Sequence, residues 1–245
     1  MARSVLVTGA SRGIGLELVK QLLKEPAYGK VLATCRNPGT AQAPSELTGL
    51  KHGHQERFQL LHMDVCNDHS IDHAVQECRN LTPSLSLLIN NAGILVKSPD
   101  RHFPHLTRDG LLHVFDTNVC SPLIVTQKFL PLLRGAEKAM VVTLSTKFAT
   151  GSGYQPAITA VTGIPYMASK AALNLGMRMM SDVLLKEGII SATLCPGVVK
   201  TAIHPEGPVG VDVSQAVGTM LKTINRLDAD AAGLLIGKNG APIAY

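Results

Sequence analysis

The chain has 245 residues, of which 45% are apolar and 17% are charged, so it can bury one large core or two small ones. Its formal net charge of +5 comes from scattered Lys and Arg residues with no cluster interleaved with aromatics, which favours a solvated basic surface over nucleic-acid binding. No apolar run reaches the roughly 18 residues of a membrane span, and the first apolar run begins too early for a signal peptide, so we expect a cytoplasmic protein.

Short β-branched runs alternate with longer segments of helical period along the chain. The predicted strands cover residues 4–8, 30–35, 58–63, 85–89, 140–144, 189–194 and a last stretch near 234–236. Long helices are predicted over 107–133 and 166–186. No linker, composition break or repeat divides the sequence, so we expect a single domain over residues 1–245. The pattern predicts the α/β class: a single-domain Rossmann fold with a doubly wound parallel sheet of about seven strands and helices on both faces.

A glycine-rich loop follows the first predicted strand. Gly9 and Gly13 allow positive φ and leave no Cβ between the backbone and a pyrophosphate, and Gly15 lets the next helix pack closely on the strand. The unpaired amides that open this helix form an anion site. The residues expected to bind a dinucleotide are therefore Gly9, Ser11, Arg12, Gly13, Ile14 and Gly15. The alternative is an ordinary strand-to-helix turn.

The end of the second strand indicates which dinucleotide is bound. An Asp or Glu there would accept a hydrogen bond from the adenosine ribose, but the strand ends in Cys35-Arg36. Arg36 and Arg12 together offer two guanidinium groups to an added phosphate, which favours NADPH over NADH. The alternative is that both are surface residues.

Two further segments follow predicted strands. Asp64-Val65 comes after the third strand, where a carboxylate can accept from the adenine amino group, although most such Asp residues are helix caps. Asn91, Ala92 and Gly93 come after the fourth strand, where the strand order switches and small residues admit a cofactor. The alternative there is an Asn-rich turn.

Tyr166 and Lys170 are the catalytic candidates, because positions i and i+4 of a helix share one face. At about 4 Å and an effective dielectric near 20, an ammonium favours phenolate by roughly 4 kcal/mol, or about three pKa units before desolvation opposes it. We therefore expect Lys170 to lower the pKa of Tyr166 into the range for proton transfer. The alternative is an exposed helix pair with no role.

With these pieces in order, the chain resembles the short-chain dehydrogenase/reductase family over nearly its whole length. The motifs that carry the resemblance are the loop from Thr8 to Gly15, Asp64-Val65, Asn90 with Ala92-Gly93, Asn118, Tyr166 with Lys170, and Pro196-Gly197-Val198. Within the family, the run from Thr34 to Asn37 and the tail from Lys238 to Tyr245 look most like the sniffer and C-factor carbonyl reductases.

The resemblance implies a carbonyl reductase. Hydride would pass from NADPH to a carbonyl carbon while Tyr166 protonates the oxygen, and Lys170 would hold the nicotinamide ribose. Asn118 would hold a water that links Lys170 to solvent. Pro196, Gly197 and Val198 would flank the nicotinamide, and Thr201 would reach its carboxamide or the phosphates.

One position departs from the family. The proton-donating serine of the family sits just past the fifth strand, where this chain has Ser145-Thr146. Thr146 keeps the hydroxyl donor but adds a methyl group that is stiff at χ1. Ser145 and Ser152 compete for the same role.

The sequence gives fewer indications about the residues that bind the substrate. Residues 147–165 are expected to line a pocket for an apolar carbonyl compound, and residues 200–213, which include His204, to close as a lid. An NADPH-binding regulatory or interaction protein with weak or no turnover is the alternative function. Assembly through the two long helices, as a homodimer or homotetramer, stays open.

Cysteine and histidine usage points away from metal chemistry. The five cysteines are widely spaced without a Cys-x-x-Cys pair, which favours reduced thiols. The pairs His69/His73 and His102/His105 have no third ligand arranged with them, so we expect no metal site.

Overall fold

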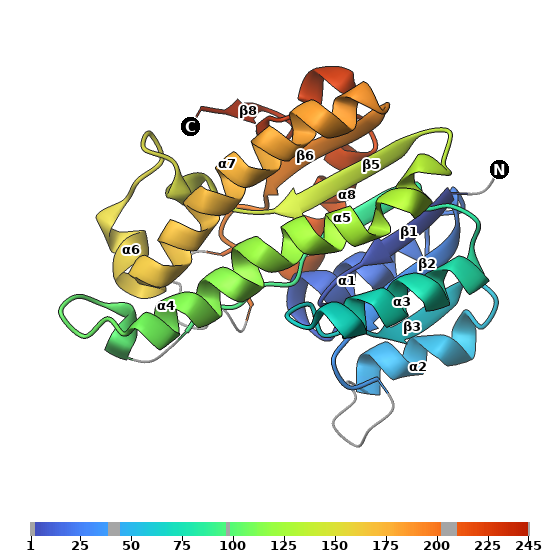
Figure 1. The fold of residues 1–245 in the computed structure, drawn as a ribbon, viewed down its shortest axis with the longest axis horizontal. Helices are drawn as coiled ribbons and strands as arrows, with labels where there is room; N and C mark the ends of the chain where they lie inside the picture. The colour runs from blue at the N-terminus through green and yellow to red at the C-terminus, as the bar shows by residue number, and fades with distance from the viewer. Residues whose placement is uncertain (1–2, 39–44, 97–98, 202–209, 245) are drawn as a thin grey trace.

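The strands form one eight-stranded sheet in the order β3-β2-β1-β4-β5-β6-β7-β8 (Figure 1). The computed structural model describes residues 3–38, 45–96, 99–201 and 210–244. The strands are β1 (Arg3–Val7), β2 (Tyr28–Cys35), β3 (Phe58–His62), β4 (Leu87–Asn90), β5 (Ala139–Leu144), β6 (Ile189–Cys195), β7 (Leu235–Gly237) and β8 (Pro242–Ile243). The strands from β1 to β7 pair in parallel, and β8 pairs antiparallel with β7. The predicted α/β class and parallel sheet are confirmed.

Helices connect and cover these strands. The α-helices are α1 (Gly13–Leu22), α2 (Ser45–Gly53), α3 (Asp68–Leu81), α4 (Arg108–Phe115), α5 (Ser121–Arg134), α6 (Pro156–Thr162), α7 (Ile164–Lys186) and α8 (Val213–Ile224). Short 3₁₀ turns are η1 (Pro99–Arg101), η3 (Lys147–Ala149) and η4 (Ala229–Ala231), and η2 (Asp116–Cys120) is a π-helical turn. Among the described residues, no helix combines the length and apolarity needed to cross a membrane.

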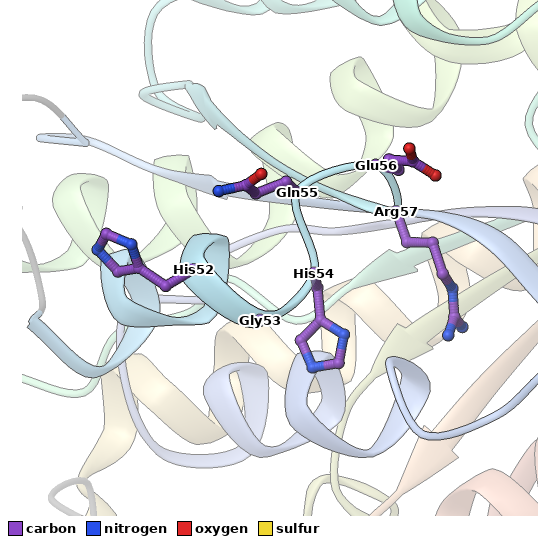
Figure 2. Close-up of a pocket in the computed structure, with 6 residues that line it drawn as sticks. All are labelled: His52, Gly53, His54, Gln55, Glu56 and Arg57. Atoms are coloured by element: carbon purple, nitrogen blue, oxygen red, sulfur yellow. The ribbon is translucent and has the colours of Figure 1, made fainter.

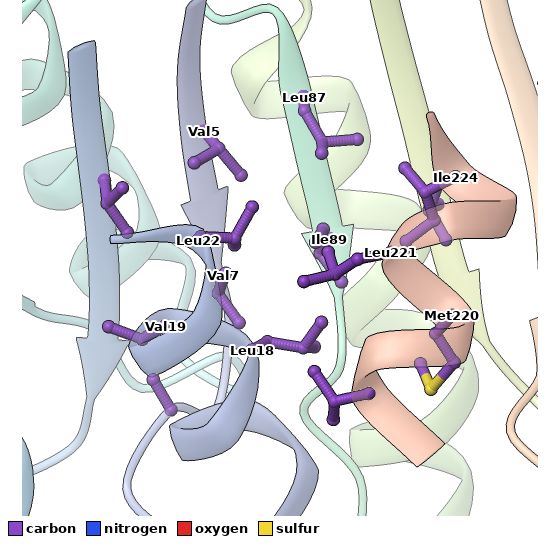
Figure 3. Close-up of a cluster of buried hydrophobic side chains, with 14 of the residues drawn as sticks. Val5, Val7, Leu18, Val19, Leu22, Leu87, Ile89, Met220, Leu221 and Ile224 are labelled. Carbon is purple, nitrogen blue, oxygen red and sulfur yellow. The ribbon is translucent and has the colours of Figure 1, made fainter. Parts of the chain in front are cut away.

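The strands are apolar on both sides because each face of the sheet is covered. In β1, Val5 and Val7 pack toward α1 and α8, whereas Leu6 belongs to the core on the side of α3, α5 and α7. Figure 3 shows the first of these cores, with side chains from α1 and α8 against β1 and β4. This alternation is the period of two that a strand imposes on a sheet buried on both faces.

The strand order reverses at β1, which has β2 on one side and β4 on the other. The connections on the two sides therefore diverge, and a crevice opens at the carboxyl ends of β1 and β4. This is the edge at which the candidate site forms.

Three differences from the sequence prediction have a clear physical cause. β8 was not predicted, because two residues are too few for an alternating pattern, and Pro242 is tolerated there only because the strand lies at the sheet edge. The stretch 147–165, expected as a pocket-lining loop, contains the short helix α6. The predicted helix over 107–133 is present but contains the π-turn η2 between α4 and α5, which run on as one rod (Figure 1).

Candidate active site

The residues that the sequence singles out gather at the edge where the parallel strands end. Gly9, Ser11, Arg12, Gly13, Ile14 and Gly15 follow β1, Arg36 follows β2, Asp64 and Val65 follow β3, Asn91, Ala92 and Gly93 follow β4, Thr146 follows β5, and Pro196, Gly197, Val198 and Thr201 follow β6. Tyr166 and Lys170 lie in the first two turns of α7, and Asn118 lies in η2. Parallel strands end at a common edge, so distant parts of the sequence meet there.

The loop after β1 brings its backbone close to the segment after β4. Gly9 and Gly13 have φ of 64° and 57°, in the left-handed region that favours glycine. A Cβ on Gly9 would lie 2.8 Å from the Cα of Ala92, and one on Gly15 would meet the Asn91 side chain. Glycine is therefore required at position 9 by both conformation and space, and at position 15 by space.

Asn91 fixes this loop in place. Its Nδ2 donates to the carbonyls of Thr8 and Gly9 at 2.8 and 3.0 Å, while Thr8 Oγ1 accepts from the amides of Asn91 and Ala92 at 3.0 Å each. Both side-chain amide hydrogens of Asn91 are thus donated to the loop. Its contact with a cofactor stays a prediction, with Oδ1 as the side-chain atom left for it.

The N-terminus of α1 is suited to an anion. Arg12 is the residue that precedes the helix, and its side chain makes no capping hydrogen bond. A Cβ on Gly13 would lie 3.6 Å from the methyl carbon of Thr201, so the loop after β6 faces this helix end. Uncapped amides at the positive end of a helix, beside a hydroxyl residue, fit the pyrophosphate of a dinucleotide.

Arg12 and Arg36 are both exposed at this edge. Neither guanidinium forms an ion pair within the part of the chain that the structure describes. No carboxylate side chain ends β2, where one would repel a phosphate on the ribose. Both arginines are therefore available to an added anionic group.

Asp64 sits in a tight turn after β3. Its Oδ1 accepts from the amide of Cys66 at 3.1 Å, and its own amide donates to Ser70 Oγ at 2.9 Å. The cap of α3 is Asn67, whose side chain accepts from the Ser70 amide. The alternative reading of Asp64 as the helix cap is wrong, and a carboxylate oxygen remains for another donor.

Tyr166 and Lys170 face each other on α7. Lys170 Nζ lies 5.9 Å from the centroid of the Tyr166 ring and donates to the carbonyl of Leu144 at 2.8 Å. Lys170 is buried, and Tyr166 is partly buried. Within the described residues the Tyr166 hydroxyl makes no hydrogen bond. The pair is therefore not exposed, as the alternative assumed, and its catalytic role stays a prediction.

The direction of the Tyr166 pKa is a correction to the sequence prediction. Burial raises the pKa of Tyr166 to about 12, with a smaller contribution from neighbouring Cys195, and burial lowers the pKa of Lys170 to about 8. Desolvation penalises the charged form of each group, so it raises the pKa of the phenol and lowers that of the ammonium. Tyr166 is thus held neutral, the form that can donate a proton.

Asn118 is fully buried in the π-turn. Its Oδ1 accepts from the Ile94 amide at 2.8 Å, and its Nδ2 donates to the Ile94 carbonyl at 2.9 Å and to Ser169 Oγ at 3.0 Å. Both amide hydrogens are therefore used within the protein. The predicted water-holding role stays a prediction and falls to the second lone pair of Oδ1 or to the backbone carbonyl.

The three candidate hydroxyls have different surroundings. Thr146 Oγ1 accepts from the Phe148 amide at 3.2 Å and so caps η3, which leaves its hydrogen free to donate. Ser145 is buried, and its hydroxyl has no partner within the described residues. Ser152 is exposed and donates its hydroxyl hydrogen to the carbonyl of Ala244 at 3.0 Å, so this hydrogen is not free for a substrate.

The loops after β5 and β6 contact each other. The Lys147 amide donates to Cys195 Sγ at 3.3 Å, and Gly197, with φ of 78°, has the Lys238 side chain against its free face. The segment predicted as a lid, 200–213, is described at its two ends. Val199, just before it, forms an isolated β-bridge with Val211, near its end. Residues 202–209, with His204, lie outside the described part of the chain.

A surface hollow of about 400 Å³ lies elsewhere, in the connection between α2 and β3. Figure 2 shows the side chains that surround it, from His52 to Arg57. Because β3 begins at Phe58, this hollow is at the amino end of the strand, opposite the edge that carries the glycine loop. Its position excludes it as the site built by the residues above.

Ser169 is the site residue that sequence reasoning missed. It lies directly before Lys170, is fully buried and bonds to Asn118. The sequence offers one signal, a hydroxyl residue three positions after Tyr166 in the same helix. That spacing also suits an ordinary bond within the helix, which is why it predicts nothing by itself.

Comparison with known proteins agrees with this geometry. A family model described as short chain dehydrogenase matches residues 3–207. An uncharacterised oxidoreductase of Schizosaccharomyces pombe is 28% identical, over 98% of this chain and 96% of its own length.

Two solved structures are similar over the whole chain. The NADPH-bound carbonyl reductase from chicken fatty liver has a TM-score of 0.88 and 33% identity, covering 100% of this chain and 99% of its own. The carbonyl reductase Sniffer of D. melanogaster has a TM-score of 0.89 and 30% identity, covering 100% of both chains.

Proposed function

The chain belongs to the short-chain dehydrogenase family, and on that premise we propose that it is an NADPH-dependent carbonyl reductase in which Tyr166 protonates the carbonyl oxygen. The substrate class is an apolar aldehyde, ketone or quinone. The observation that carries the proposal is the buried Lys170 ammonium 5.9 Å from the Tyr166 ring, beside a phenol held neutral by burial.

Different residues at the carboxyl edge of the sheet bind different parts of the cofactor. When bound, NADPH supplies the hydride that the carbonyl carbon accepts. The amides that open α1, with Thr201 opposite them, hold the pyrophosphate, and Asp64 and Val65 hold the adenine. Pro196, Gly197 and Val198 flank the nicotinamide.

Proton transfer falls to α7 and its neighbours. Tyr166 donates its phenolic proton to the oxygen, and Lys170 holds the ribose and stabilises the phenolate that results. Thr146 polarises the carbonyl with the hydrogen that its cap of η3 leaves free. Asn118 supports the path by which Tyr166 regains its proton.

The preference for NADPH rests on Arg12 and Arg36. Replacing Arg36 by Asp puts a carboxylate where it repels the ribose phosphate and accepts from a ribose hydroxyl. We expect NADPH to bind about tenfold more weakly or worse, since hydrogen bonds to charged groups contribute about 1.5–3 kcal/mol, and NADH to bind more tightly. Titration of both cofactors measures this. The control is Arg79→Asp, an exposed charge reversal near the end of α3, and equal NADPH affinity in the two variants would contradict the proposal.

The proposal extends to the whole chain. Residues 1–245 form a single nucleotide-binding domain, supported by the joining of all described strands in one sheet. Its location in the cytoplasm stays a prediction.

The test is NADPH consumption with a panel of quinones, aromatic aldehydes, diketones and ketosteroids, with Tyr166→Phe in parallel. We expect turnover that is lost in the Phe variant, because Phe keeps the ring but has no proton to donate. NADPH binding without turnover on any carbonyl would favour the alternative, a cofactor-binding regulatory protein, and would contradict the reductase.

A further inference from the structure

Ser169 joins three parts of the candidate site. Its hydroxyl donates to the Tyr166 carbonyl at 2.7 Å and accepts from Asn118 Nδ2 at 3.0 Å. The first bond is the ordinary one that a serine makes within its own helix. The second reaches out of α7 to the π-turn η2, and no feature of helix formation requires it.

The network continues to the segment after β4. Asn118 pairs with both backbone groups of Ile94, accepting from its amide at 2.8 Å and donating to its carbonyl at 2.9 Å. Asn118 and Ser169 are each 0% exposed, so neither can exchange these partners for water. A buried network with its donors satisfied holds one geometry, and loss of one member leaves a buried group unpaired.

The far end of this network lies beside the Lys170 ammonium. A Cβ on Gly93 would lie 3.3 Å from Asn118 Oδ1 and 3.7 Å from Lys170 Nζ. The open face of Gly93 therefore lies against both the amide of Asn118 and the Lys170 ammonium, and Ile94, the next residue, is bonded to Asn118. Rotation of the Asn118 amide would break its two bonds to Ile94 and so free the backbone next to Gly93.

We propose that Ser169 is a positioning residue: its hydroxyl fixes the Asn118 amide, which in turn holds Gly93 and Ile94 in place beside Lys170. The inference deepens the proposed reductase function and rests on it for the catalytic consequence. The structural consequence, the ordering of residues 91–96, stands independently of turnover.

The same helix offers a matched control in Ser181. It is 1% exposed, and its hydroxyl donates to the Ser191 carbonyl of β6 at 3.1 Å. Ser181→Ala therefore removes a buried serine hydroxyl from α7 at a place remote from the site. Ser169→Cys supplies the graded variant, because a thiol keeps the size of the side chain but is a weaker hydrogen-bonding group.

The experiment compares wild type, Ser169→Ala, Ser169→Cys and Ser181→Ala by hydrogen exchange and by kinetics. We expect faster exchange in residues 91–96 in Ser169→Ala, because the Ile94 amide loses its fixed acceptor, and wild-type exchange there in Ser181→Ala. We expect kcat of Ser169→Ala to fall about tenfold, equal to about 1.4 kcal/mol, with KM for the carbonyl little changed. Ser169→Cys should lie between.

Two results would overturn the proposal: unchanged exchange in residues 91–96 in Ser169→Ala, or a kcat equal to that of Ser181→Ala. If Ser169→Ala does not fold, Ser169→Cys is judged by the same comparisons. A wild-type protein without turnover would refute the proposed function, and the exchange comparison would then decide whether Ser169 orders this segment.

Discussion

Lys170 retains its ammonium charge only at pH values below about 8, because burial lowers its pKa to about 8. Tyr166, with a pKa raised to about 12, is neutral on both sides of that value. Carbonyl reduction needs a neutral phenol and a charged lysine, and both are present below pH 8. Above it the phenol is still able to donate, but the charge that stabilises its conjugate base is lost.

We therefore predict that kcat/KM for reduction is level below about pH 8 and falls as the pH rises through it. Because kcat/KM for the carbonyl, with NADPH saturating, reports the enzyme–NADPH complex before the carbonyl binds, the break should follow Lys170. In Lys170→Arg, whose guanidinium stays charged, residual activity should show no break near pH 8. A level wild-type profile from pH 7 to 10, measured with a saturating cofactor, would contradict the assignment.

The hydroxyl that polarises the carbonyl is Thr146 in this account. Thr146→Ala should lower kcat by about 10²- to 10³-fold, as expected when one oxyanion donor is removed. Ser152→Ala should stay close to wild type, because its hydroxyl binds the Ala244 carbonyl. Ser145→Ala removes a buried hydroxyl without a described partner and should also be mild. Equal activity in all three variants would rule out a hydroxyl donor.

At this scale the sequence predicts residue types better than contacts. The glycine loop, Tyr166 and Lys170 have fixed spacings that local geometry explains, so their positions at the carboxyl edge could be foreseen. The partners of Asn91 and Ser169 come from other elements, and no local pattern encodes them. The predicted lowering of the Tyr166 pKa is wrong because the burial that raises it depends on the whole fold.

The loop after β1 packs closely against the segment after β4, and a substitution at Gly9 can test this contact. Gly9→Ala puts a Cβ at φ of 64° and 2.8 Å from the Ala92 Cα. We predict a loss of about 2 kcal/mol or more in the free energy of unfolding, because the left-handed conformation alone costs about 1–2 kcal/mol. NADPH binding should weaken with it.

Gly49→Ala is the matched control for this substitution. Gly49 lies in α2, and a Cβ there would meet nothing within 4 Å. Alanine should stabilise that helix by about 0.5–1 kcal/mol. Urea denaturation of both variants measures the difference, and a Gly9→Ala protein as stable as wild type would show that the two loops do not make this contact.

The elements that the sequence missed share a physical cause. The seven parallel strands are buried on both faces and carry continuous apolar runs, which sequence patterns register well. β8 has two residues and α6 has seven, so neither contains enough turns or alternations to be distinguished from a loop. The π-turn in the long helix adds a residue to one turn without changing the apolar pattern around it.

The longest helix, α7, carries apolar side chains on two sides. One side of α7 packs into the core: Leu173, Met177 and Leu184 are buried, and Met180 is partly buried against them. On the opposite side, Leu175, Met179 and Val183 are 57%, 64% and 60% exposed and follow one another at helical spacing. Apolar rows on both sides of a helix are typical of a helix with a second partner.

Assembly through the long helices remains a prediction, and it places the interface on this exposed row. A double substitution, Met179→Glu with Val183→Glu, should convert a dimer to a monomer in sedimentation experiments, because it introduces like charges across a two-fold interface. The reductase activity of the monomer should persist, since the row is remote from Tyr166 in the helix. A wild-type protein that sediments as a monomer at every concentration would contradict the prediction.

The central claim is that hydride passes to a carbonyl carbon while Tyr166 supplies the proton. The most direct test uses NADPH with deuterium at both C4 positions, an aldehyde or ketone that supports turnover, and mass spectrometry of the alcohol formed. We predict one deuterium on the carbinol carbon with wild-type protein and no labelled alcohol with Tyr166→Phe. Alcohol without deuterium, or equal labelling by the Phe variant, would contradict it.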